Sequence, residues 1–180
     1  MREATRAEQS RKLSGAASRL LDKARDLHLE VPLDLERLAI ARGCGYYERD
    51  LGPRIAPLEE VPLSNAELAI ALVVPSVRRS AREIRLAAAL LGAADAPAAD
   101  VARLALEEDC ADVVRHITSC GHRFEPENAF WASLLDLLPD VKVDADRFPH
   151  PTRFVEMTGI DRGKVGMFTR WIRPRARLPA

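Results

Sequence analysis

Residues 64–92 read SNAELAIALVVPSVRRSAREIRLAAALLG, and this stretch contains two helix-start signals. Ser64 precedes Glu67 by three residues, and Ser80 precedes Glu83 by the same spacing. At that spacing the serine hydroxyl accepts from the backbone amide of the glutamate, while the carboxylate accepts from the backbone amide of the serine. The sequence therefore predicts two helices that begin at these serines, the second of which ends at the glycine that closes the stretch.

Four further helices are predicted from the spacing of apolar residues. Residues 5–29 have the three-and-four spacing of an amphipathic helix that packs on its own domain. The helices predicted over 34–43 and 100–119 each begin at an aspartate N-cap, and Gly121 is expected to end the second of them. The last helix begins at Pro126 or Asn128 and continues to Leu138, before Pro139. One inner side of the helix over 100–119 is expected to carry Leu106, Cys110, Val113, Val114 and Ile117.

The pattern changes after the last predicted helix. Residues 153–158 and 164–172 are typical of two short strands that flank a glycine-bearing turn, which indicates a β-hairpin. An isolated hairpin is only marginally stable in water, so this one must pack on the helices. The side chains available for that contact are Phe154, Met157, Phe168 and Trp171.

Length and composition favour a single domain. The chain has 180 residues, of which 47% are hydrophobic, and a chain of this size buries enough surface to fold without disulfides. We expect a mostly α-helical, single-domain bundle of about six helices with a short C-terminal β-hairpin and a basic tail. Residues 1–146 form the predicted helical domain, and residues 147–180 form the hairpin and tail packed on it.

Apolar run lengths, the N-terminal sequence and the number of cysteines indicate the cellular compartment of the protein. The apolar runs are shorter than the roughly 18 residues of a membrane span, so no membrane association is expected. The N-terminus has no continuous apolar core of the kind found in secretory signals. Three cysteines are an odd number in a chain without an export signal, which argues for reduced thiols and a cytoplasmic location.

Charge is divided between two neighbouring segments. Residues 94–146 hold 4 basic and 12 acidic residues, a net charge of −8. Residues 147–180 hold 8 basic and 2 acidic residues, a net charge of +6. Such segregation bears on association and steering rather than on the fold, so it indicates contact, either between the two segments or with outside partners.

The basic segment also contains aromatic residues. Guanidinium groups pair with phosphates and aromatic faces stack on bases, so this mixture is what single-stranded nucleic acid requires. The alternative is internal, with the segment lying across the acidic helices and pairing with Asp109, Asp112 or Asp136. The candidate contacts in this segment are Arg153, Lys164, Arg170, Trp171, Arg173, Arg175 and Arg177.

A second basic group lies at the start of the helix capped by Ser80. Positive charge there opposes the helix dipole, and an anion or an acidic partner would relieve it. Together with the preceding helix the group resembles a helix-turn-helix, but the connector over 75–80 is longer than the usual three to four residues or so. A solvated or internally paired helix face is the simpler interpretation. The group consists of Arg78, Arg79, Arg82 and Arg85.

A metal site is considered and not adopted. Cys110 and His116 are six residues apart on a helix, so their side chains lie on different faces and cannot share one ion. His116, Cys120 and His122 remain as three possible ligands, with His150 as a distant fourth. Buried free cysteines and a surface histidine explain the same residues, so we expect no metal and no cofactor.

Catalytic motifs are missing from the sequence. It contains no Walker loop, no glycine-rich dinucleotide turn, no nucleophile elbow and no His-Glu-x-x-His segment. We therefore expect a protein that is not an enzyme and that acts in the cytoplasm through protein–protein contacts, with a different protein or with a second copy of itself. The alternative is nucleic-acid binding through the basic C-terminal segment, assisted by the arginines between positions 78 and 85.

Overall fold

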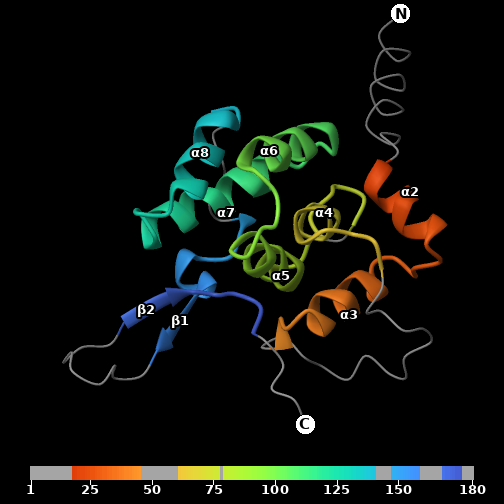
Figure 1. Ribbon diagram of the computed structural model, residues 1–180, viewed down its shortest axis with the longest axis horizontal. Coiled ribbons are helices and arrows are strands. Elements are labelled where there is room, and N and C mark those ends of the chain that lie inside the picture. The colour runs from red at the N-terminus through yellow and green to blue at the C-terminus, as the bar shows by residue number, and fades with distance from the viewer. Residues whose placement is uncertain (1–17, 46–60, 78, 141–146, 159–167, 176–180) are drawn as a thin grey trace, which may run out of the picture.

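The computed structural model describes residues 18–45, 61–77, 79–140, 147–158 and 168–175 of the chain (Figure 1). These residues form a mostly helical domain with a two-stranded antiparallel hairpin near the C-terminus, which confirms the predicted fold class. The helices are α2 (Arg19–Asp26), α3 (Leu33–Ala41), α4 (Asn65–Ala71), α5 (Ala81–Leu91), α6 (Ala98–Glu107), α7 (Ala111–Phe124) and α8 (Ala129–Leu137). A 3₁₀ helix, η3 (Pro151–Phe154), precedes strands β1 (Val155–Thr158) and β2 (Phe168–Trp171).

Both predicted capping boxes are present. The Ser64 hydroxyl accepts from the Glu67 amide at 3.0 Å, and the Glu67 carboxylate accepts from the Ser64 amide at 2.8 Å. The Ser80 amide donates to Glu83 Oε2 at 2.9 Å in the second box. Helices α4 and α5 therefore begin where the sequence predicts, and α5 ends at its C-cap Gly92, again as predicted.

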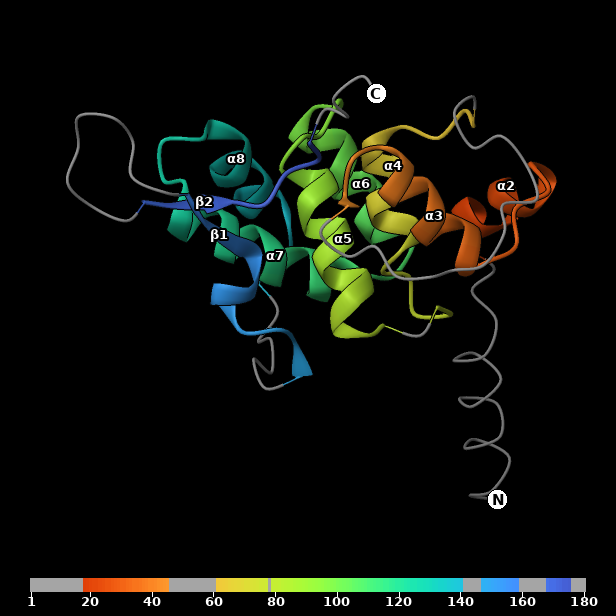
Figure 2. The same ribbon diagram turned by 90° about the horizontal axis from the view of Figure 1, so that it is seen from below.

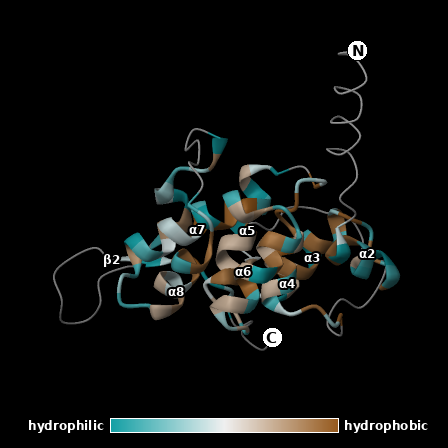
Figure 3. Ribbon diagram, turned by 90° about the horizontal axis from the view of Figure 1, so that it is seen from above, coloured by the Kyte–Doolittle hydropathy of each residue, from teal (hydrophilic) through white to brown (hydrophobic). Residues whose placement is uncertain are grey.

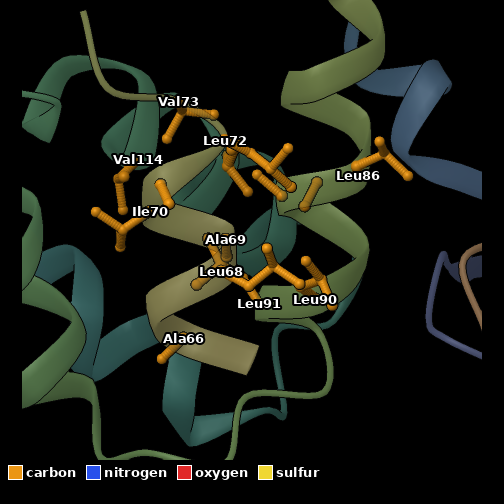
Figure 4. Packing of buried hydrophobic residues seen from close by; sticks show 14 of the residues in the cluster. Ala66, Leu68, Ala69, Ile70, Leu72, Val73, Leu86, Leu90, Leu91 and Val114 are labelled. Carbon is orange, nitrogen blue, oxygen red and sulfur yellow. The ribbon is translucent and has the colours of Figure 1, made fainter. Parts of the chain in front are cut away.

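Helices α4 and α5 form the centre of the core. They pack on each other, with α2 and α3 on one side and α6, α7 and α8 on the other (Figure 1). All residues from Leu68 to Val74 are fully buried, and Ile70 points toward Val114 of α7 (Figure 4). Hydropathy follows this arrangement, because apolar residues concentrate on the central helices and polar residues on α2 (Figure 3).

The predicted helix over 100–119 is two helices, because the chain turns sharply between α6 and α7. Asp109 adopts a left-handed backbone with φ of 52°, and the Cys110 amide donates back to the Ala105 carbonyl at 2.9 Å. The turn brings the buried Glu108 carboxylate to the N-terminus of α2, where Glu108 Oε1 accepts from the Leu20 amide at 3.0 Å. A contact between residues 88 positions apart thus accompanies the break.

Gly121 does not end a helix, contrary to the prediction, because α7 continues to Phe124. A Cβ on Gly121 would lie 2.5–2.8 Å from atoms of the Trp131 ring, so this glycine permits close contact between α7 and α8. The prediction that Leu106 lies on an inner side is also wrong, since 53% of Leu106 is exposed in the last turn of α6.

Two predicted N-caps are also wrong. Pro32 is the N-cap of α3 and Pro97 is the N-cap of α6. Asp34 and Asp100 lie instead in the first turns of these helices, where a carboxylate is favourable to the helix dipole. The first predicted helix ends at Asp26 rather than near residue 29, and its part before residue 18 lies outside the described residues.

The hairpin packs on the helices through aromatic side chains, as the sequence predicts. Phe154 and Trp171 are fully buried, whereas the side chains of Met157 and Phe168 lie outside the described part of the chain. In the hairpin register Trp171 is opposite Val155. Figures 1 and 2 show the hairpin at the end of the molecule opposite α2.

Candidate interaction surface

Arg79 connects the end of α4 to the start of α7. Its Nε donates to the Val73 carbonyl at 2.7 Å, and its Nη2 donates to the Asp109 carbonyl at 3.3 Å. Its Nη1 also pairs with Asp112 at 3.4 Å. Arg79 of the second basic group thus holds two helices together, whereas Arg78 lies outside the described residues.

Arg82 belongs to a polar cluster between α5 and α3. Its Nε donates to Glu36 Oε2 at 2.8 Å, and only 3% of the Glu36 side chain is exposed. Burial by itself raises the pKa of Glu83, but hydrogen bonds from Ser80 and from its own backbone outweigh burial and lower it. Arg82 therefore serves a buried contact between helices.

The remaining arginine of the second group reaches the hairpin. Arg85 Nε donates to the Arg153 carbonyl at 3.0 Å, which ties α5 to η3. The side chains of Arg153 and Arg170 themselves are exposed at the surface. Arg175 is the other described candidate for nucleic-acid contact whose side chain is exposed. Lys164 and Arg177 lie outside the described residues.

Arg173 anchors the segment that follows β2. Its Nη1 and Nη2 donate to the two carboxylate oxygens of Glu125 at 2.6 Å each, and its Nε donates to the Gly92 carbonyl at 2.8 Å. Glu125 Oε2 also accepts from Trp131 Nε1 at 3.0 Å. Burial raises the pKa of Glu125, but the bonds from Arg173, Trp131 and Asn128 outweigh it and lower that pKa. The Glu125 carboxylate therefore connects the end of α7 to α8 and to the C-terminal segment.

Trp171 and Arg175 make two further anchors. Trp171 Nε1 donates to the Ala88 carbonyl at 3.0 Å, so this candidate for base stacking is a core residue. The Arg175 amide donates to the Gly43 carbonyl at 3.0 Å, and its guanidinium pairs with Glu156 at 2.6 Å. We call residues 171–175 the C-terminal strap, because they cross α5 and reach the end of α3.

The strap therefore meets the acidic segment 94–146, as the internal alternative supposed, but at a different residue. Arg173 pairs with Glu125, whereas Asp109 and Asp112 contact Arg79. The charge pattern left contact between the two segments and contact with outside partners both open, and it could not indicate which carboxylate would be used.

Two of the residues considered as metal ligands, His116 and Cys120, lie together in a packed cluster. His116 Nε2 lies 3.1 Å from the Pro149 carbonyl and 3.9 Å from Cys120 Sγ, and the ring stacks on Phe148. Burial lowers the pKa of His116 and raises the pKa of the Cys120 thiol to about 11. Within the described ranges, no three His, Cys, Asp or Glu side chains are grouped to hold a metal ion.

Two large apolar side chains are exposed on helices that pack against each other. Leu106 of α6 is 53% exposed and Leu137 of α8 is 49% exposed. Exposed carboxylates lie on the same helices at Glu107 and Asp136. The sequence reading missed both leucines, because in an apolar-rich helix the spacing alone does not separate the inner from the outer side. We call Leu106 and Leu137 the exposed leucine pair.

No family model, no curated protein and no solved structure matches this chain. None of the helices in the described ranges combines the length and the apolar character that a bilayer crossing requires.

Proposed function

We propose that this protein acts by binding another protein through the surface of α6 and α8, without catalysis. The observation that carries the proposal is the exposed leucine pair, Leu106 and Leu137, on two helices that pack side by side. Each leucine is about half exposed, so burying it at an interface contributes about half of the 1.5–3 kcal/mol of a fully exposed side chain. Glu107 already pairs with Arg103 at 3.1 Å, so the acidic neighbour that would favour a partner with basic residues is Asp136.

The contacts that the arginines make inside the molecule support the same proposal. Arg79, Arg82 and Arg173 all donate to acceptors inside the molecule. A guanidinium that is already held in a fork by a carboxylate must break that contact before it binds a phosphate. Nucleic-acid binding through these arginines would therefore work against the fold.

The compartment is part of the proposal. Cys44, Cys110 and Cys120 are all buried and free, which suits a reducing compartment such as the cytoplasm.

Site-specific photo-crosslinking tests the proposed surface. A photoreactive amino acid is placed at Leu106 or Leu137 in cells, and the matched control places it at Ser119, which is exposed on α7. We expect covalent adducts with a protein at the two leucine positions and none at the control position. Adducts of equal yield at all three positions, or none at any, would contradict the proposal.

Nucleic-acid binding is the second candidate, because Arg153 is exposed on η3 and Arg170 is exposed on β2. Binding to duplex DNA should weaken with salt by about 0.9 in log–log slope for each phosphate neutralised. The double variant Arg153→Ala, Arg170→Ala should then lower the slope by about 1.8. A chain that binds neither DNA nor RNA at low ionic strength eliminates this candidate.

A further inference from the structure

A buried carboxylate connects the end of α6 to the start of α2. Glu108 is the C-cap of α6, and only 5% of it is exposed, although its neighbours Glu107 and Asp109 both face solvent. Glu108 Oε1 accepts from the Leu20 amide in the first turn of α2 at 3.0 Å. Within the described residues, no other hydrogen bond or ion pair joins α2 to α6.

The Glu108 contact completes the cap that α2 makes for itself. The Ser18 hydroxyl accepts from the Leu21 amide at 3.1 Å, and the Leu20 amide has no acceptor inside its own helix, because it lies in the first turn. A carboxylate at a helix N-terminus is also favourable to the helix dipole. Docking of α2 and the buried position of Glu108 therefore depend on each other.

The turn that places Glu108 is held in an unfavourable backbone conformation. Asp109 has φ of 52°, which is left-handed and costs energy in a residue with a Cβ. Two backbone bonds close the turn, from the Asp109 amide to the Leu106 carbonyl at 3.3 Å and from the Cys110 amide to the Ala105 carbonyl at 2.9 Å. Strain of this kind persists only where the surroundings enforce it, and the contact of Glu108 with α2 is part of those surroundings. Loss of that contact should let the turn relax.

Leu106 of the exposed leucine pair belongs to the same turn. It lies two residues before Glu108, in the last turn of α6, and its carbonyl is one of the two acceptors that close the turn. A relaxed turn would therefore change the position of the Leu106 side chain, which is now 53% exposed. The state of α2 thus bears on one member of the pair.

Helix α2 is an element that can open without the rest of the fold. It has eight residues, packs on α4, and buries Leu20, Leu21 and Ala24. Its ion pair with α4, between Lys23 and Glu67, is partly exposed and so contributes little. Figures 1 and 2 show α2 at the end of the molecule opposite the hairpin. A short peripheral helix with few buried side chains opens at a lower free energy than the core.

We propose that α2 and the turn between α6 and α7 open and close as one unit, so that docking of α2 through Glu108 fixes the position of Leu106. Glu108 is a positioning residue in this unit, because it acts on the leucine through the turn. A role in regulating partner binding rests on the function proposed for α6 and α8. By linkage, a partner that requires the present position of Leu106 would also favour docked α2.

Native-state hydrogen exchange of the purified full chain tests the coupling without a partner, so the result does not depend on whether the surface binds a protein. Leu21→Ala weakens docking, because Leu21 is 2% exposed, and should raise the opening constant of α2 by about 30-fold or more. We expect exchange of the Asp109 and Cys110 amides to rise by a similar factor. Ala24→Gly is a milder variant if the first does not fold, with a rise of about fivefold in both places. A rise confined to α2 would overturn the proposal.

Glu108→Ala tests whether the carboxylate carries the coupling. With Glu108 replaced, adding Leu21→Ala should still speed exchange in α2 but should leave exchange at Asp109 and Cys110 unchanged. Leu38→Ala is the matched control, because Leu38 is a leucine of α3 that is 1% exposed. This control should raise exchange in α3 and leave the turn at its wild-type rate. A response of the turn that persists without Glu108, or an equal response to Leu38→Ala, would also overturn the proposal.

Discussion

Replacing Gly121 with alanine should destabilise the protein, although alanine is the better residue for a helix. Gly121 lies inside α7, where alanine would ordinarily stabilise by about 1 kcal/mol. At this position the new Cβ would lie 2.5 Å from Cδ2, 2.6 Å from Cε2 and 2.8 Å from Cε3 of Trp131. The indole would have to move by about 1 Å to restore an ordinary van der Waals contact.

The Trp131 ring is poorly able to move. It is fully buried, it meets the Trp171 ring edge-on at 5.1 Å between centroids, and its Nε1 donates to Glu125. Overpacking costs about 1–3 kcal/mol, and loss of a hydrogen bond to a charged group costs about 1.5–3 kcal/mol. After the gain in helix propensity, we expect a net loss of about 1.5–5 kcal/mol in the free energy of unfolding.

Urea unfolding monitored by tryptophan fluorescence and by circular dichroism measures this loss. Gly45→Ala is the control, because no atom lies within 4 Å of a Cβ at that position; we expect a change within about 0.5 kcal/mol. A second test repeats Gly121→Ala in a Trp131→Leu background, where removal of the ring should make the alanine much less costly. Gly121→Ala with wild-type or greater stability would refute the argument.

Three further predictions concern polar contacts. Ser80→Ala should cost about 0.5–2 kcal/mol at neutral pH, and the cost should shrink below about pH 4.5 in urea titrations, because the lowered pKa of Glu83 stabilises the fold only above its unfolded value. Arg173→Lys should lower the stability by about 1.5–3 kcal/mol in thermal unfolding, because an ammonium cannot hold both oxygens of Glu125; a neutral result would contradict this role. Burial lowers the pKa of His116, so its contribution is complete above about pH 6.5 and is lost as the pH falls. His116→Gln should therefore flatten the stability profile below that pH, and an unchanged slope would argue against it.

The helix starts were predictable because their signals are local. Ser64 and Ser80 lie three residues before the glutamates that complete their capping boxes, so the interaction is contained within one turn. Asn128 is a similar case, since its side chain accepts from the Phe130 amide. The hairpin was predictable from two short strand-like runs around a glycine-bearing turn, and its packing from the apolar side chains that it carries.

The break between α6 and α7 was not predictable in the same way. The partner of Glu108 is the Leu20 amide, 88 residues earlier in the chain, so no window of sequence contains both groups. Gly121 misled for a related reason, because a glycine near the expected end of a helix resembles a C-cap until its neighbour Trp131 is known. Both errors occur where a distant residue decides the local conformation.

The candidate interaction residues also differ in how far the sequence could predict their contacts. Segregated charge predicted that the basic segment would have an acidic partner, yet the choice of Glu125 by Arg173 depends on how α7, α8 and the strap meet. The exposure of Leu106 and Leu137 could not be predicted from the spacing of apolar residues. A leucine at the edge of an amphipathic face looks like a core residue until the helix is oriented.

Charge alone does not explain the position of the C-terminal strap. Gly43 has φ of +104°, and a Cβ there would lie 2.1 Å from the Arg175 carbonyl oxygen; a Cβ on Gly92 would lie 2.5 Å from Trp171. An arm that served only to reach a phosphate would require no such absence of side chains at the ends of α3 and α5. Two glycines that make room for the strap, together with the fork of Arg173 on Glu125, are what a built-in structural element requires. A partner is therefore to be sought at the surfaces that these contacts leave exposed.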